Sequence, residues 1–118
     1  MRDYWKVLME IRKEDEKYFN NYIQYAKRIK EKAKEILGDR RLRVIVFGSV
    51  VTGKSDARSD IDILIISEKV SNSSLKQAEI IAELLKDIGI FAPFQIHLAT
   101  PEIYEQWYKR FIKEWVEV

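Results

Sequence analysis

Two aspartates, Asp60 and Asp62, stand two positions apart within an apolar run that continues to Ile66. Residues i and i+2 of a β-strand share a face and lie about 6.6 Å apart. Paired carboxylates of this kind suit Mg²⁺, which prefers one or two carboxylates together with phosphate oxygens of a substrate. A turn of small residues, Gly48-Ser49, comes ten residues before them and lets the backbone approach a phosphate closely. The spacing therefore predicts a site for a divalent metal and a phosphate.

The intervening loop adds two cations, Lys54 and Arg58, which can neutralise phosphate charge. Residues 48–55 also satisfy the P-loop pattern G-x-x-x-x-G-K-[ST]. A P-loop depends on a helix that begins at its Lys-Ser and aims its amides at phosphate. Only residues 56–59 separate Ser55 from the next strand, which is too short for a crossover helix. We therefore reject the P-loop interpretation and favour a site formed by the Gly-Ser turn and the Asp-x-Asp pair. A turn and a strand end without function would not explain why both acids share one face.

Residues 47–49 (Phe-Gly-Ser) and 59–63 (Ser-Asp-Ile-Asp-Ile) resemble the signature of the DNA polymerase beta nucleotidyltransferase superfamily. The chain is similar in particular to its small stand-alone members, the minimal nucleotidyltransferases. The resemblance implies one α+β domain over residues 1–118, with a small mixed sheet of three or more strands flanked by helices. It also implies transfer of a nucleoside monophosphate from a nucleoside triphosphate such as ATP, with two Mg²⁺ ions.

By the same resemblance, Gly48 and Ser49 would hold the triphosphate, whereas Asp60 and Asp62 would bind the metal. Relatives of this kind are often paired with a helical protein as toxin–antitoxin systems, so the acceptor is expected to be bound by such a partner or by a homodimer. A second hypothesis keeps nucleotide binding but weakens the chemistry, and makes the chain a regulator or antitoxin-type partner of a helical protein.

One position departs from the family pattern. Members usually carry a third carboxylate on a later strand, and the matching strand here, residues 94–98, has Gln95 in that place. A glutamine carbonyl can bind Mg²⁺ but cannot accept a proton. His97 shares the face of Gln95 and is a candidate base, weak ligand, hydrogen-bond partner of the aspartates or structural residue. Asp56 and Glu68 are further possible donors.

The elements that must position this site follow from periodicity. Residues 1–37 predict a helix, with a possible break at 14–16 and an end at Gly38. Residues 43–47 predict a buried central strand, 48–59 a loop, and 60–66 a second strand. On that strand the isoleucines face the core and the aspartates face a cleft; the core-facing residues are Ile61, Ile63 and Ile65.

The second half predicts a helix, a strand and a helix. Ser74 and Gln77 have capping-box spacing and begin a helix that Gly89 ends. Its predicted core stripe consists of Leu75, Ala78, Ile81, Leu85 and Ile88. After the strand at 94–98, Thr100-Pro101-Glu102 begins a last helix. Its predicted aromatic face, either core or a partner site, consists of Ile103 or Tyr104, Trp107, Phe111 and Trp115.

The composition of the chain excludes several classes of site and partner. The chain has 118 residues, a formal net charge of +2 and no cysteine. Disulfides and thiolate metal sites are excluded. Residues 27–43 carry eight basic and three acidic residues, interleaved as on a solvated helix face, so tight nucleic-acid binding is not expected. No apolar run approaches the roughly 20 residues of a membrane span, and no signal segment is recognisable at the N-terminus. We expect a cytoplasmic protein without membrane attachment.

Overall fold

The computed structural model describes residue 6 and residues 16–53, 60–89 and 92–118. Residues 16–20 are helical and precede the other elements. Those elements follow one another as α2 (Tyr22–Leu37), β1 (Arg43–Phe47), α3 (Ser49–Thr52), β2 (Ile61–Ile66), α4 (Ser74–Leu85), β3 (Phe94–Ala99), α5 (Pro101–Gln106), the 3₁₀ turn η1 (Tyr108–Arg110) and β4 (Trp115–Glu117).

The described strands form one mixed sheet in the order β3-β2-β1-β4. Strand β1 is antiparallel to both β2 and β4, whereas β2 and β3 are parallel and joined through α4. The predicted α+β class with a small mixed sheet is therefore confirmed. No helix within the described ranges is both long enough and apolar enough to cross a membrane.

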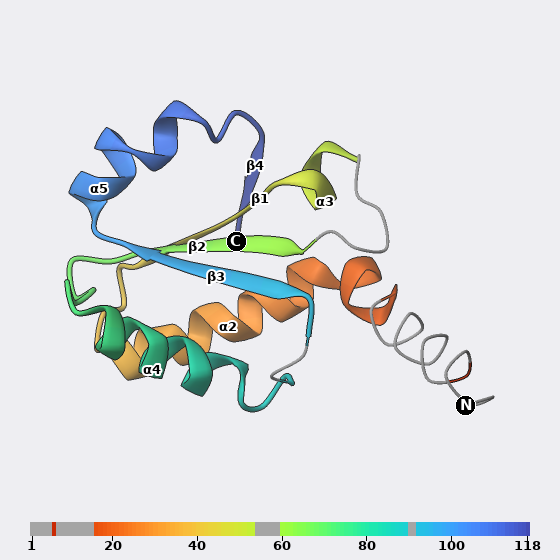
Figure 1. Ribbon diagram of the computed structural model, residues 1–118, viewed down its shortest axis with the longest axis horizontal. Helices are drawn as coiled ribbons and strands as arrows, with labels where there is room; N and C mark the ends of the chain where they lie inside the picture. Colours follow the sequence, from red (N-terminus) through yellow and green to blue (C-terminus); the bar gives the residue numbers. More distant parts are fainter. Residues whose placement is uncertain (1–5, 7–15, 54–59, 90–91) are drawn as a thin grey trace.

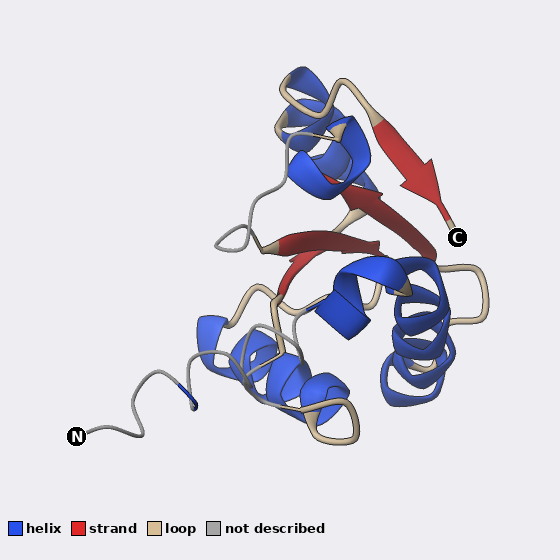
Figure 2. Ribbon diagram, turned by 90° about the vertical axis from the view of Figure 1, so that its right-hand side faces the viewer, coloured by secondary structure: helices blue, strands red, loops and turns tan. Residues whose placement is uncertain are grey.

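Helices cover the two faces of the sheet unequally. In Figure 1, α2 and α4 lie below the sheet and α5 lies above it; Figure 2 shows the layers from the side. The lower layer encloses the larger apolar cluster, which includes the fully buried Ile61, Ile63 and Ile65. A smaller cluster under α5 and η1 contains Leu64 and Tyr104. Alternate residues of β2 thus enter two different cores.

Helix α2 packs closely on the sheet because small residues recur on its inner face. Ala26, Ile29 and Ala33 are fully buried, at spacings of three and four residues. The helix ends at Gly38 with φ 64°, where the glycine amide donates to the carbonyl of Lys34. This left-handed cap is the one that the sequence predicts.

The helix predicted over residues 1–37 is interrupted at Asn21, where no break was expected, and Asn21 forms a turn between two helical segments. The Asn21 Nδ2 atom donates to the carbonyl of Lys17 at 2.9 Å. In a continuous helix that carbonyl would accept the backbone amide of residue 21, so the side chain replaces a helical hydrogen bond. Of the predicted break at 14–16, residues 14 and 15 lie outside the described residues.

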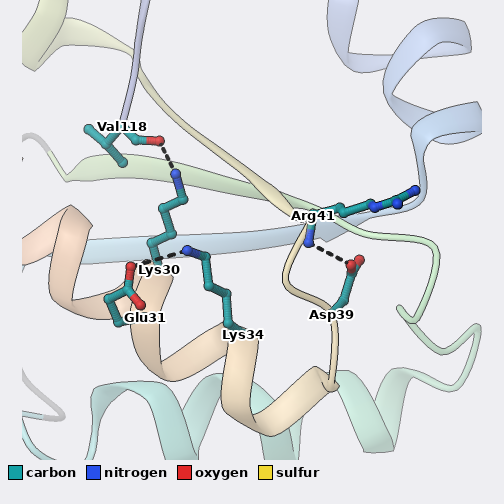
Figure 3. A network of polar contacts seen from close by, with 6 residues as sticks. All are labelled: Lys30, Glu31, Lys34, Asp39, Arg41 and Val118. Carbon is teal, nitrogen blue, oxygen red and sulfur yellow. Dashed lines mark hydrogen bonds and ion pairs between the residues drawn. The ribbon is translucent and has the colours of Figure 1, made fainter.

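Polar contacts fix the connections around α2 (Figure 3). Lys30 Nζ donates to the carbonyl of Val118 at 2.7 Å, which ties α2 to the residue after β4. In the turn before β1, Asp39 accepts the backbone amide of Arg41 at 2.9 Å. It also accepts the hydroxyl of Ser67, which the figure does not draw, at 2.6 Å. The Ser67 hydrogen bond, followed by that of Arg41, holds the pKa of Asp39 below its usual range.

The N-cap residue of helix α4 lies one position earlier than predicted. The cap is Ser73, whose Oγ atom accepts the backbone amide of Lys76 at 3.3 Å. Gln77 does not complete a capping box, because its side chain donates to the carbonyl of Ser71 at 2.6 Å.

The predicted core stripe of α4 is also partly wrong. Leu84, which it omits, is 1% exposed, whereas Leu75 is 70% exposed. Apolar residues occupy two overlapping stripes on this helix, and the one that packs against the core is centred on Ile80, Ile81 and Leu84. Periodicity alone does not select between stripes of similar hydrophobicity.

The last helix is much shorter than predicted. Thr100 caps it as expected, accepting the amide of Ile103 at 3.3 Å with Pro101 in the first turn, but α5 ends at Gln106. The chain then returns to the sheet as β4 and pairs with β1. The predicted aromatic face is therefore not on one helix. Tyr104 lies on α5 and is buried, whereas Trp107 and Phe111 flank η1, Trp115 begins β4, and all three are exposed. The predicted loop 48–59 likewise begins with a short helix, α3.

The two leucines of α4 provide a test of this packing. We expect Leu84→Ala to lower the free energy of unfolding by about 2–5 kcal/mol, since it leaves a cavity in the core. The matched change Leu75→Ala, in the first turn of the same helix, should alter it by less than about 0.5 kcal/mol. Urea denaturation followed by circular dichroism measures both. Equal effects would contradict the assigned helix face.

Candidate active site

Asp62 lies on β2 on the face opposite the buried isoleucines, as the alternation predicts. It stands directly opposite Phe47 of β1 and Gln95 of β3, and paired residues of neighbouring strands share a face. Its side chain is 24% exposed. The same face is closed further along β2, where Leu64 is buried under the α5 layer. The accessible part of this face is thus confined to the end of the sheet at which β2 begins.

Gly48 brings the backbone against the Asp62 carboxylate. A Cβ atom at Gly48 would overlap Asp62 Oδ2, and the φ of Gly48 is 89°, which L side chains rarely adopt. Ser49 follows at once and begins α3, whose first turn closes with the amides of Val51 and Thr52 on the Gly48 carbonyl at 3.1 and 3.3 Å. The Gly-Ser turn and the second aspartate of the motif therefore meet in space.

His97 also reaches Asp62. Its Nε2 atom lies 3.3 Å from Asp62 Oδ1, and donates when it carries the proton. Two aromatic rings hold the imidazole in place, with centroids at 5.5 Å for Phe47 and 5.8 Å for Tyr108. Burial raises the pKa of Tyr108, so this neighbour stays neutral. Of the roles considered for His97, the structure shows the hydrogen bond to an aspartate.

The other two predicted catalytic residues, Asp60 and Gln95, lie at the same end of the sheet. Gln95 is exposed and stands opposite Asp62, where the family pattern has an acid. Asp60 is exposed and directly precedes β2. Asp62 is thus the residue on which Gly48, His97 and the position of Gln95 converge.

Several predicted residues do not add to the described site. Lys54 and Arg58, together with the possible donor Asp56, lie outside the described residues. Glu68 follows β2, at the end of the strand opposite to Asp62, and lines a separate surface pocket with Val70.

The donor set limits what metal chemistry these residues support. Within the described ranges, no three acidic or histidine side chains are arranged to hold a metal ion. The carboxylates of Asp60 and Asp62 would instead need phosphate oxygens and water to complete a coordination shell. Mg²⁺ is bound in proteins in this way, so these residues fit it. The missing Cβ of Gly48 lets the Asp62 carboxylate lie directly against the backbone of the Gly-Ser turn.

Sequence reasoning missed Tyr108 as part of the surroundings of His97. The expected long C-terminal helix left no reason to place this tyrosine over the sheet. The break after Gln106 and the buried Ile112 bring it there, and no local sequence signal marks that break.

Comparisons with known proteins identify the family of this chain. A family model described as the nucleotidyltransferase domain matches residues 26–117, which is most of the chain. The chain therefore belongs to the nucleotidyltransferase domain family. A search of curated proteins finds no significant match.

Two solved structures are similar to this chain. One, provisionally described as a nucleotidyltransferase, has a TM-score of 0.60 and 25% identity, and covers 83% of this chain and 98% of that one. A second, from Sulfolobus solfataricus and with the same provisional description, has a TM-score of 0.53 and 19% identity, covering 83% and 82%. The second likeness shows the fold.

Gly48→Ala tests the contact at the centre of the site. We expect it to displace Asp62 and to abolish binding of Mg²⁺ and nucleotide, because the new Cβ would occupy the position of Asp62 Oδ2. Gly38→Ala is the matched control: its φ is also positive, at 64°, but a Cβ there meets nothing within 4 Å. Both variants should lose stability through backbone strain, by about 1 kcal/mol or more.

Isothermal titration with Mg²⁺ and ATP distinguishes the effects of the two glycine substitutions. Binding should survive in Gly38→Ala and be lost in Gly48→Ala under conditions in which both are folded. Unimpaired binding by Gly48→Ala would show that the contact with Asp62 is not needed for the site.

Proposed function

We propose that this protein transfers a nucleoside monophosphate from a nucleoside triphosphate to a hydroxyl acceptor, in a reaction that requires Mg²⁺. The observation that carries this proposal is the juxtaposition of Gly48 and Asp62 in a chain of the nucleotidyltransferase family. A triphosphate that follows the turn at Gly48 and Ser49 would pass beside the Asp62 carboxylate, where a metal ion is needed.

The carboxylates of Asp60 and Asp62 would hold Mg²⁺, in two sites if both family metals are used. Bound there, Mg²⁺ neutralises phosphate charge and stabilises the charge that develops during transfer. Gly48 offers a backbone without a side chain to the triphosphate. His97 orients Asp62 by its contact with Oδ1 and is itself held between Phe47 and Tyr108.

The chemistry is a displacement at the α-phosphorus. The acceptor oxygen forms a bond to this phosphorus while the bond to the bridging oxygen of the β-phosphate breaks, and pyrophosphate leaves. The hydroxyl proton must pass to Asp60, Asp62, His97 or water, because the amide of Gln95 cannot accept it.

The position of Gln95 supports a second candidate function. An exposed, neutral amide stands opposite Asp62 where a third carboxylate is usual. The second candidate is a regulator that binds Mg²⁺ and a nucleoside triphosphate without turning it over, in association with a helical partner protein.

Asp62→Asn tests the transferase directly. With an α-labelled nucleoside triphosphate, Mg²⁺ and cell extract as the source of acceptor, we expect label transfer to fall by about 100-fold or more. Glu68→Gln is the matched control, since it removes a carboxylate beyond the other end of β2 and should leave transfer unchanged. Transfer that persists in Asp62→Asn at the wild-type rate would contradict the proposal.

Gln95→Glu separates the two candidates. If the protein is a regulator, the wild type binds Mg²⁺ and nucleotide without turnover, and Gln95→Glu gains measurable label transfer. If it is an enzyme, the wild type already transfers label. Ready turnover by the wild-type protein eliminates the regulator.

A further inference from the structure

One row of directly paired residues crosses the whole sheet at the active-site end. It consists of Trp115 on β4, Phe47 on β1, Asp62 on β2 and Gln95 on β3. Because paired residues share a face, the Trp115 indole stands on the same face as the Asp62 carboxylate.

Trp115 is the exposed aromatic residue of this row. It remains 47% exposed, whereas Phe47 is only partly exposed and packs against His97. Among the described residues, no ring pairs with the Trp115 indole, although Phe111, earlier in the chain, pairs with both Trp107 and Tyr108. The indole thus presents an uncovered aromatic surface beside the site.

The spacing of the sheet places this surface at a useful distance. Neighbouring strands lie about 4.8 Å apart, so two steps separate Trp115 from Asp62 by about 10 Å. In a nucleoside triphosphate whose α-phosphate lies at Asp62, the ribose and the base together extend from that phosphate over a similar span. The base would then reach the indole.

Strand β4 is short, but it is firmly held. Arg43 makes two hydrogen bonds to Glu117, at 3.1 and 2.8 Å, and the guanidinium lowers the pKa of that carboxyl. The amide of Val118 donates to the carbonyl of Val44 at 3.0 Å, and Lys30 binds the Val118 carbonyl. These contacts fix the position of Trp115 before any ligand arrives.

We propose that Trp115 is the stacking platform for the base of the nucleoside triphosphate. This inference rests on the proposed function of the Gly48–Asp62 site. Bases of every kind offer a π-face, so a single ring contributes affinity and orientation without strong selection among bases. The stacked base would orient the ribose and α-phosphate toward Asp62, which makes Trp115 a binding residue rather than a catalytic one.

Paired titrations test the inference. Isothermal titration with ATP and Mg²⁺ should show that Trp115→Ala weakens binding by about 5- to 100-fold, the range expected for loss of one base–aromatic stack. Inorganic tripolyphosphate with Mg²⁺, which has no base, should bind wild type and Trp115→Ala equally. Trp115→Phe should recover most of the ATP affinity. Trp107→Ala, which removes another exposed tryptophan outside the row, should leave both affinities unchanged.

Each other outcome is decisive. Equal ATP affinity in Trp115→Ala and wild type overturns the stacking role and leaves Trp115 as a candidate contact for a protein. Equal weakening of ATP and tripolyphosphate shows that the residue acts through the structure of the site, and overturns it too. If the wild type binds neither ligand, the proposed function itself fails.

A measurement on the wild-type protein avoids dependence on how the variants fold. Photolysis of 8-azido-ATP bound with Mg²⁺ should label the tryptic peptide that begins at Glu114, since trypsin cleaves after Lys113. Excess ATP should prevent the labelling. Protectable label found only on peptides outside β4 would overturn the proposal.

Discussion

The contact between Gly48 and the Asp62 carboxylate is the constraint on which the rest of the site depends. Antiparallel pairing places Phe47, the last residue of β1, opposite Asp62. The chain must then turn away next to that carboxylate, and a residue without a Cβ is required there. The pairing register is protected by Ile61, Ile63 and Ile65, because a slip of one residue would exchange the buried and accessible faces of β2.

The sheet brings together residues that are distant in the chain. Parallel pairing of β3 with β2 delivers Gln95 and His97 beside Asp62, and the return of the chain as β4 delivers Trp115 on the other side of Phe47. The α2–α4 layer supplies most of the buried apolar surface. The thinner α5–η1 layer covers only part of the opposite face, which leaves the end at Asp62 accessible. One face of the sheet thus contributes most of the buried core, and the opposite face carries the candidate site.

Local signals predicted those features that depend on a few neighbouring residues. The strand at Asp62, the Gly38 helix end and the Thr100 cap are confirmed, because each is determined by side-chain alternation, a positive φ or a capping hydroxyl. Strand β4 was missed, since a three-residue strand exists only through pairing with β1, and Trp115 also fits a helical period with Trp107 and Phe111. The contacts of Asp62 with Gly48 and His97 likewise depend on sheet register, which the motif implies but does not specify. The metal, phosphate and catalytic roles of all the site residues, Asp62 and Gly48 included, stay predictions.

A crystal structure of the protein with Mn²⁺ and a nucleoside triphosphate analogue that cannot be cleaved at the α-phosphorus tests most directly whether Asp60 and Asp62 hold the metal. Anomalous scattering would locate the metal independently of the nucleotide. We expect a metal peak between Asp60 and Asp62, with the triphosphate lying along Gly48 and Ser49. A metal and nucleotide bound elsewhere, with no metal peak at the Asp62 carboxylate, would contradict the proposed site.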